Sequence, residues 1–211
     1  MAEATLLSVG WFSHVARVVG AALLRLVVGV EVIGAGNVPP DGPLLVVANH
    51  RHWLDPVVIY CFFPRTVAFM AKAELFRHPL IRWILQGTLA FPVRRDGGDM
   101  NALRRALAIL ARGGVVGMFP EGTRSRSAAL RPPYPGAGFL VARSRAPVVP
   151  VALVGTEEGL LGRRSPVRMI IGRSWCLAEG AGSAPEDISR ILMDRVAELL
   201  HAPALDRYRE G

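Results

Sequence analysis

Short apolar runs constrain the fold of this chain more than any other feature. They occupy residues 44–48, 115–119 and 148–154, and a fourth lies at residues 167–171. A helix that spans a bilayer shows about 18 or more consecutive apolar residues, and the sequence contains no such run. Runs this short are typical of strands buried on both faces of a sheet. Pro150, inside the third run, predicts an edge strand or a bulge at that point.

Segments with helical spacing separate these runs. Asp99 is expected to cap a helix that continues to residue 111, where Gly113 and Gly114 stop it. Further helices are expected over residues 56–63, over residues 139–144, and after a capping box at residues 183–186. Strands that alternate with helices predict an α/β domain.

Residues 10–29 are expected to form a helix that is apolar over most of its surface. At about 100° per residue, His14, Arg17, Ala21 and Arg25 fall together on one narrow face. This pattern suits a helix in a membrane interface whose arginines reach lipid phosphates. A helix that packs on the domain core with its arginines outward has the same pattern, so both arrangements stay open.

Charge and composition narrow the class of partner. The chain is 51% hydrophobic with a mean hydropathy of +0.33, which lies between a cytosolic enzyme and a membrane protein. Its net charge of +8 indicates either nucleic acid or an anionic lipid surface. Lys72 is the only lysine; arginine suits phosphate, although a genomic preference for arginine codons explains the same count. Since no helix-turn-helix, zinc-ligand or RNP pattern is present, nucleic acid is not an expected partner.

The two cysteines and the N-terminal sequence indicate the cellular compartment. Cys61 and Cys176 lie in apolar runs without metal-ligand spacing, which predicts free thiols and no metal site. The N-terminus lacks the basic region of a signal peptide, so we expect the protein inside the cell.

The first chemical constellation is Asn49-His50-Arg-His-Trp-Leu-Asp55, directly after a buried strand. Histidine accepts a proton near neutral pH, and a nearby carboxylate fixes its tautomer and strengthens it as a base. A straight helix would hold side chains five positions apart at about 140°, so His50 and Asp55 meet only if a turn intervenes. The strand-to-helix junction supplies one. The alternative is a histidine that merely caps a helix or has its hydrogen bonds satisfied at the end of a strand.

Two further turns carry arginine. Residues 119–125 (Phe-Pro-Glu-Gly-Thr-Arg-Ser) follow another strand and are typical of an anion-binding turn, where Arg124 grips phosphate and Gly122 lets N–H groups approach. Residues 91–95 (Phe-Pro-Val-Arg-Arg) end an apolar run, where Arg94 and Arg95 point to the same anion or to solvent. A surface loop with a local ion pair is the alternative for residues 119–125.

These motifs, with Val-Pro-Val at residues 149–151, resemble in content and order the 1-acyl-sn-glycerol-3-phosphate acyltransferase (PlsC-like) family. The resemblance runs from about residue 34 to residue 172, roughly two thirds of the chain. It implies a mixed, largely parallel sheet flanked by helices. It also implies an amphipathic membrane-associating segment over residues 1–33 and a catalytic domain over residues 34–211.

The resemblance implies a role for each matched residue. His50 would deprotonate the acceptor hydroxyl and Asp55 would orient His50. The acceptor site would be formed by Asn49, Arg94, Arg95, Glu121, Gly122, Thr123 and Arg124. The acyl donor would be acyl-CoA or acyl-carrier protein, with no metal and no other cofactor, and the enzyme would lie peripherally or monotopically on the cytoplasmic face of the membrane. The implied product is phosphatidic acid, made from 1-acylglycerol 3-phosphate.

Four departures from the family pattern leave the acceptor open. His52 stands where many relatives have serine, and Arg94 where many have aspartate. Gly87 lies earlier than the usual glycine, and Tyr134 and Pro135 replace a common lysine before Gly136. Glycerol 3-phosphate, another lysophospholipid or a glycolipid therefore remain alternative acceptors. A lipid-binding module without turnover is the alternative from another class, but it gives His50 and Asp55 no purpose.

Overall fold

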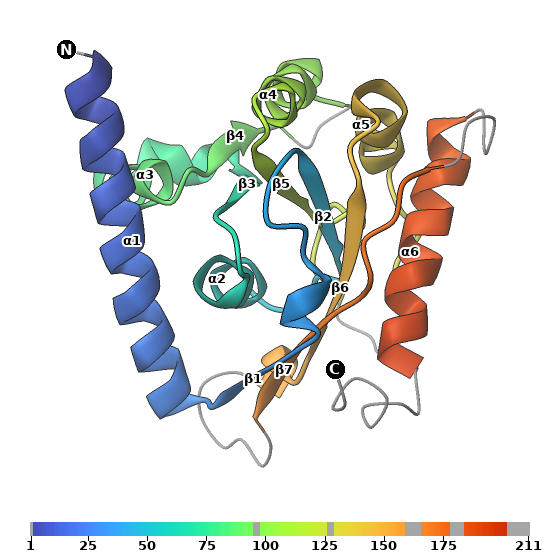
Figure 1. Cartoon of the computed structure of the whole chain (residues 1–211), viewed down its shortest axis with the longest axis horizontal. Coiled ribbons are helices and arrows are strands. Elements are labelled where there is room, and N and C mark those ends of the chain that lie inside the picture. The colour runs from blue at the N-terminus through green and yellow to red at the C-terminus, as the bar shows by residue number, and fades with distance from the viewer. Residues whose placement is uncertain (1, 95–97, 126–128, 159–165, 178–183, 202–211) are drawn as a thin grey trace.

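The computed structural model describes residues 2–94, 98–125, 129–158, 166–177 and 184–201. Within these residues, seven strands form one sheet in the order β1-β7-β6-β2-β5-β3-β4, and only the β6–β7 pair is antiparallel (Figure 1). The strands are β1 (Val30–Ile33), β2 (Leu44–Ala48), β3 (Val67–Lys72), β4 (Phe91–Val93), β5 (Val115–Met118), β6 (Val148–Val154) and β7 (Val167–Ile171). The predicted α/β class with a mixed, largely parallel sheet is confirmed.

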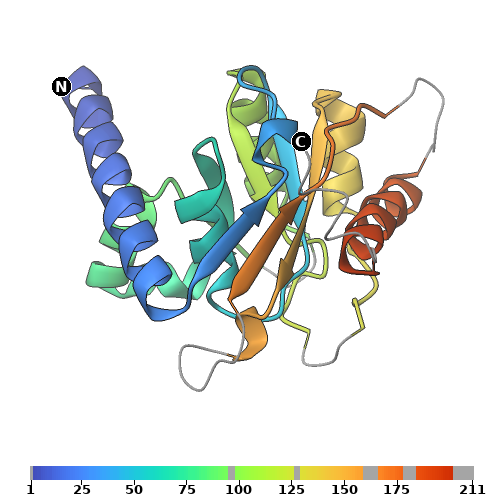
Figure 2. The same cartoon turned by 60° about the horizontal axis from the view of Figure 1, so that its bottom comes forward.

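Helices cover both faces of this sheet. They are α1 (Ala2–Val27), α2 (Asp55–Phe62), α3 (Pro79–Gly87), α4 (Met100–Ala111), α5 (Gly136–Ser144) and α6 (Pro185–His201), with 3-10 turns at Ala35–Asn37, Ala73–Arg77 and Thr156–Glu158. One core joins α1 and α2 to one face of the sheet, and a second joins α4, α5 and α6 to the other. Figures 1 and 2 accordingly show α1 and α6 on opposite sides of the molecule.

The central strands agree with the apolar runs, and other elements differ from the prediction. β5 ends at Met118, one residue earlier than expected, and α5 begins at Gly136 rather than at residue 139. Strands β1, β3 and β4 were not predicted. Asp99 does cap α4, since its carboxylate accepts the N–H groups of Asn101 and Ala102. The expected cap at Ser183 lies outside the described residues.

Pro150 lies in an interior strand, so the edge-strand alternative was wrong and the bulge alternative holds. β6 lies between β7 and β2. Val151 pairs with Ile171, whereas Val148, three residues earlier, pairs with Trp175, four residues later. The extra residue on the β7 side is a bulge, and it opens the ladder where proline has no N–H to donate.

Helix α1 turns Arg17 and Ala21 of its predicted stripe toward the protein, together with Leu24, whereas His14 and Arg25 of the same stripe are exposed. Ser13 and Ala21 are buried, while Leu26 is 84% exposed. Arg17 donates to the carbonyl of Phe63 at 2.5 Å. Arg17 therefore fits neither of the two arrangements left open, at lipid phosphate or outward from a core-packed helix: it satisfies a carbonyl just after α2, which has no further helical partner.

A close seam joins α1 to α2. The hydroxyls of Ser13 and Tyr60 lie 2.8 Å apart, and Tyr60 also donates to the carbonyl of Ser13. A Cβ atom on Gly20 would lie 2.8 Å from the sulfur of Cys61, so glycine permits this approach. Burial raises the pKa of Cys61 to about 11, which keeps the thiol protonated at neutral pH. Over the described residues, no helix combines the length and the apolarity that crossing a bilayer requires.

The seam between α5 and α6 gives a stability test. A Cβ atom on Gly138 would lie 1.9 Å from the backbone oxygen of Pro185, whereas one on Gly136 would meet nothing closer than 3.6 Å. We expect Gly138→Ala to lower the free energy of unfolding by about 1–3 kcal/mol, because the helices must separate. Gly136→Ala is the matched control and should be neutral or stabilising, since alanine favours helix over glycine by about 1 kcal/mol. Denaturant titration of both variants measures the difference, and equal stabilities would contradict the seam.

Candidate active site

The candidate residues gather at one edge of the sheet because β2, β3, β4 and β5 are parallel and end on the same side. Residues 49–55 follow β2, residues 119–125 follow β5, and Arg94 follows β4. Sites in α/β sheets form at these carboxyl ends. Neighbouring strands lie about 4.8 Å apart, so the end of β4, three strands from β2, lies roughly 14 Å from the end of β2.

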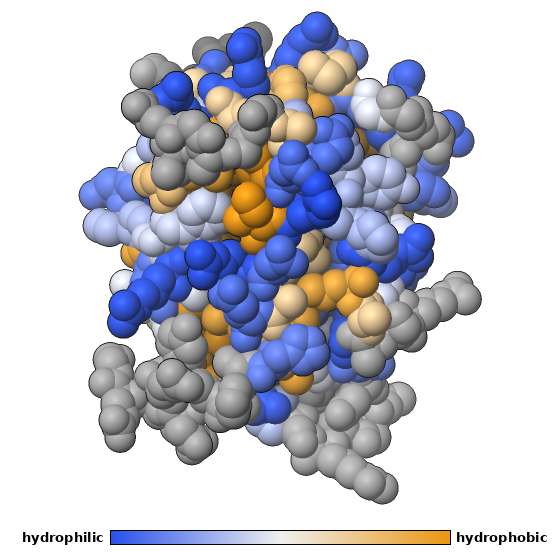
Figure 3. All heavy atoms as spheres, turned by 90° about the vertical axis from the view of Figure 1, so that its right-hand side faces the viewer, coloured by the Kyte–Doolittle hydropathy of each residue, from blue (hydrophilic) through white to orange (hydrophobic). Residues whose placement is uncertain are grey.

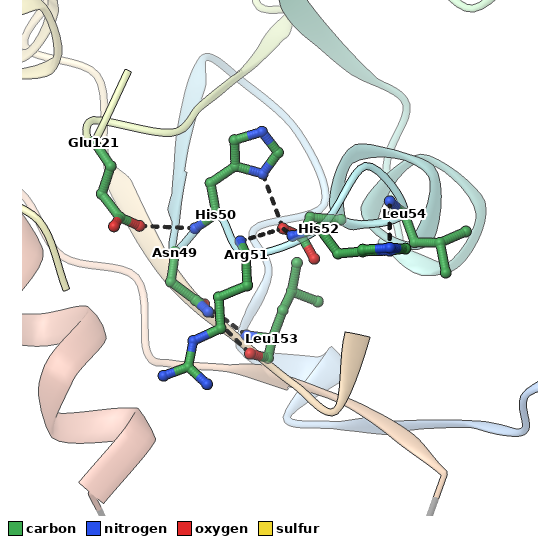
Figure 4. A network of polar contacts seen from close by, with 8 residues as sticks. Asn49, His50, Arg51, His52, Leu54, Glu121 and Leu153 are labelled. Atoms are coloured by element: carbon green, nitrogen blue, oxygen red, sulfur yellow. Dashed lines mark hydrogen bonds and ion pairs between the residues drawn. The ribbon is translucent and has the colours of Figure 1, made fainter. Parts of the chain in front are cut away.

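His50 and Asp55 form a buried pair. Nδ1 of His50 lies 2.8 Å from Oδ2 of Asp55, whose side chain is fully buried (Figure 4). The carboxylate accepts, so Nδ1 carries the proton and Nε2 of the neutral ring holds a lone pair. Among the described residues Nε2 has no hydrogen-bond partner. The ring is therefore arranged to take a proton at Nε2.

The turn expected between His50 and Asp55 is present, and Asp55 itself organises it. Oδ2 of Asp55 also accepts the backbone N–H groups of Arg51 at 2.6 Å and of His52 at 2.7 Å. The N–H of Asp55 donates back to the carbonyl of His52 at 3.2 Å. One carboxylate oxygen thus closes the turn and orients the imidazole, and its negative charge stabilises a protonated ring.

Stacked aromatic rings hold the other side of His50. The imidazole lies on the ring of Phe119 with centroids 4.2 Å apart and an interplanar angle of 21°. Phe119 in turn lies on Phe69 of β3 at 5.4 Å. No pattern in the sequence pointed to Phe69, because its contact depends on β3 lying beside β5.

The side chain of Glu121 is buried against the backbone of His50. It is 1% exposed, and its Oε1 accepts the backbone N–H of His50 at 2.8 Å (Figure 4). Its Oε2 accepts the N–H of Arg131 at 3.0 Å. Both oxygens of the carboxylate are therefore used by the backbone.

Asn49 points away from the imidazole. Its amide donates to the carbonyl of Leu153 at 2.9 Å and accepts the N–H of Leu153 at 2.8 Å (Figure 4). The side chain thus continues the pairing of β2 with β6 after the main chain has turned away. Both ends of the Asn49 amide are therefore used by the backbone of β6, and its predicted contact with substrate stays a prediction.

The turn that carries Arg124 is open to solvent on one side. Gly122 has φ +66°, and its N–H donates to the carbonyl of Phe119 at 3.0 Å. A Cβ atom there would lie 2.7 Å from the ring of Tyr134, so glycine serves both the turn and this contact. Thr123 is half-buried and Arg124 is exposed, so both stand where an acceptor can reach them.

The second arginine turn is held by Asp99. Its carboxylate accepts the N–H of Arg94 at 2.9 Å while it caps α4. The N–H groups of Arg94 and Ala102 keep the pKa of Asp99 below its usual value, so the carboxylate stays ionised at neutral pH. Arg94 is exposed, and Arg95 lies outside the described residues. Among the described residues no group of three His, Cys, Asp or Glu side chains is placed to hold a metal ion.

Comparison with known proteins identifies the family. The family model described as Acyltransferase matches residues 29–154, which is more than half of the chain. The chain belongs to this acyltransferase family. The protein is accordingly an enzyme that transfers acyl groups.

Named relatives and a solved structure agree with this assignment. The chain is 32% identical to 1-acyl-sn-glycerol-3-phosphate acyltransferase of Bacillus subtilis, over 71% of this chain and 75% of that protein. It is 32% identical to the chloroplastic 1-acyl-sn-glycerol-3-phosphate acyltransferase BAT2 of Brassica napus, over 67% of this chain but only 43% of that protein. The crystal structure of the 1-acyl-sn-glycerophosphate acyltransferase PlsC from Thermotoga maritima superposes with a TM-score of 0.72. That alignment has 27% identity and covers 90% of this chain and 80% of that one.

Residues 49–55 contain a second histidine, His52, and its contacts differ from those of His50. His52 Nδ1 lies 3.4 Å from the N–H of Leu54, and its ring tilts against Trp53, so within the described residues no carboxylate orients it. We expect His50→Ala to lower kcat for acyl transfer by about 10²–10⁴-fold, the usual contribution of a general base. His52→Ser should retain activity within a few-fold. If both variants are folded and lose kcat to a comparable degree, the assignment of His50 as the base is wrong.

Proposed function

We propose that this acyltransferase moves a fatty acyl group from a thioester to the free hydroxyl of 1-acylglycerol 3-phosphate and so forms phosphatidic acid. The observation that supports this most directly is the His50–Asp55 pair, with Nδ1 and Oδ2 at 2.8 Å and Nε2 left open. Arg124, one strand away after β5, supplies the positive charge that a phosphorylated alcohol needs.

The reaction follows from the position of Nε2. The acceptor hydroxyl gives its proton to Nε2 of His50 while its oxygen attacks the thioester carbonyl carbon. The resulting tetrahedral intermediate expels the thiolate, the C–S bond breaks, and His50 returns the proton to sulfur. An ester and a thiol are formed, and no acyl-enzyme is needed. Asp55 stabilises the imidazolium that exists between the two steps.

The acceptor site has two arginine-bearing turns. Arg124 and Thr123 follow β5, and Arg94 follows β4 on the same edge of the sheet. We assign the phosphate of the acceptor to these turns and its hydroxyl to His50. Acyl-CoA and acyl-carrier protein are both anionic donors that suit a chain of net charge +8. The reaction as proposed takes no cofactor beyond this thioester co-substrate.

A membrane surface, on its cytoplasmic side, is the proposed location of the enzyme. The apolar surface of α1 and α3 supports this. We call it the α1–α3 surface. It comprises Trp11, Val18, Val19, Leu23 and Leu26 of α1 and Leu80, Trp83 and Ile84 of α3. Exposed apolar groups of this size cost free energy in water and gain it in the acyl region of a bilayer.

The opposite side of the molecule differs. Figure 3 shows hydrophilic side chains over much of the α6 side, with apolar residues in several separate places. The contrast between the two sides gives the protein a direction in which to dock on lipid.

The proposed reaction is tested by acyl transfer from labelled oleoyl-CoA to a panel of acceptors in mixed micelles. The panel holds 1-acylglycerol 3-phosphate, glycerol 3-phosphate, lysophosphatidylcholine and monoacylglycerol, with His50→Ala in parallel. We expect the first acceptor to be used fastest, and the variant to be nearly inactive. Preference for another acceptor would keep the chemistry but replace the proposed product.

Arg124→Ala tests the phosphate site. We expect the KM for 1-acylglycerol 3-phosphate to rise about tenfold or more, because a charge-assisted hydrogen bond to phosphate contributes about 1.5–3 kcal/mol. The KM for monoacylglycerol, which has no phosphate, should change little. An unaltered KM for the phosphorylated acceptor would remove Arg124 from the site.

Vesicle co-sedimentation tests the α1–α3 surface. We expect the double variant Leu26→Ser, Trp83→Ser to bind vesicles at least about tenfold more weakly, since burying each side chain contributes about 1.5–3 kcal/mol. Ile191→Ser on α6, also a partly exposed apolar residue, is the matched control and should bind like the wild type. Equal binding by all three proteins would contradict docking through this surface.

A further inference from the structure

The backbone of His50 is held at both of its polar groups by the turn of residues 119–125. Its N–H donates to Oε1 of Glu121 at 2.8 Å, and its carbonyl accepts the N–H of Ser125 at 2.8 Å. These two contacts cross from the end of β2 to the loop after β5. They fix the main chain from which the imidazole extends.

The second oxygen of Glu121 ties down the far end of the same loop. Oε2 accepts the N–H of Arg131 at 3.0 Å. The N–H of Tyr134 donates to the carbonyl of Pro120 at 2.8 Å, close by in the chain. Glu121 thus joins three segments of backbone: the base, the turn with Arg124, and residues 131–134.

Burial separates Glu121 from the acceptor. The residue is 1% exposed, whereas Thr123 and Arg124 beside it are accessible. A substrate hydroxyl that reached its carboxylate would have to displace a backbone N–H and leave that donor unpaired, which is costly in a buried site. A buried carboxylate with a backbone donor on each oxygen is instead suited to fixing geometry.

From these contacts we propose that Glu121 is a positioning residue that holds the backbone of His50 in register with the acceptor turn, and that it does not bind the acceptor. This rests on the acyl transfer proposed above. The two buried carboxylates then divide the work. Asp55 orients the imidazole ring through Nδ1, and Glu121 fixes the position of the His50 main chain that carries the ring. An acceptor held by Arg124 is aligned with Nε2 because both depend on one loop.

Glu121→Gln is the first test, because the amide keeps the shape of the side chain but offers an oxygen to only one of the two N–H donors. We expect kcat to fall about 10–100-fold, since a base displaced by about 1 Å loses up to about 10²-fold. The KM for 1-acylglycerol 3-phosphate should stay within about threefold. The loss of kcat should be equal for monoacylglycerol, because the effect acts through His50.

Glu157→Gln is the matched control. Glu157 pairs with the side chain of Arg51, next to His50, at 2.8 Å, so the variant removes a neighbouring carboxylate charge without touching the His50 backbone. Its kcat should stay within about twofold to threefold of the wild type, as expected for a partly exposed ion pair. Glu121→Asp retains the buried charge but is too short to reach both donors, and should lose kcat like Glu121→Gln. It serves if the glutamine variant fails to fold.

Hydrogen exchange followed by mass spectrometry gives a readout that needs no activity. We expect Glu121→Gln to speed exchange in peptides that cover residues 49–52 and 129–134, with β6 and α6 unchanged. Unchanged exchange in the peptides that cover residues 49–52 and 129–134 would contradict the positioning role of Glu121, even if the enzyme transferred no acyl group. A rise of more than about tenfold in the KM for the phosphorylated acceptor, with kcat retained, would overturn it by making Glu121 an acceptor ligand.

Discussion

A single buried oxygen atom, Oδ2 of Asp55, organises the chemistry of this protein. It accepts the ring N–H of His50 and the backbone N–H groups of Arg51 and His52, at 2.6 to 2.8 Å. A buried carboxylate needs such donors to be stable, and here all three meet Oδ2, whereas the buried Oδ1 of Asp55 has no hydrogen-bond partner among the described residues. The turn after β2 therefore forms around the charge, and the imidazole is oriented by the same contact that closes the turn. When the loop folds around Oδ2 of Asp55, the imidazole of His50 is therefore oriented as well.

The sequence predicted the centre of the fold because buried parallel strands are apolar throughout, as in Leu44–Ala48. It missed β1, β3 and β4, since β1 carries Glu31, β3 ends in Lys72 and β4 has only three residues. The pairing of His50 with Asp55 was readable from spacing because the partners are five positions apart. The backbone partners of Asn49 and Glu121 lie 104 and 71 positions away, so spacing could not reveal these contacts, and only the family resemblance suggested a role for the two residues.

The orientation of α1 shows a second limit of pattern reading. Helical spacing correctly placed Arg17 and Ala21 on one face, but it could not say what that face meets. Its partners, Tyr60, Phe63 and Thr66, lie on and just after α2. Small and polar residues such as Ser13 and Gly20 allow α1 to approach α2 closely. Leu24 joins the core, and several larger apolar residues of α1, such as Trp11 and Leu26, are left exposed.

The pairing of strand β1 affects how the chain folds during its synthesis. Its partner β7 begins 137 positions later, where Val30 pairs with Val167. During synthesis the first helix leaves the ribosome long before its adjoining strand can be completed. Until then, the apolar surface of α1 has no completed sheet beside it. If the chain docks on lipid through this helix as proposed, the same contact would shield the nascent chain from aggregation while its sheet is incomplete.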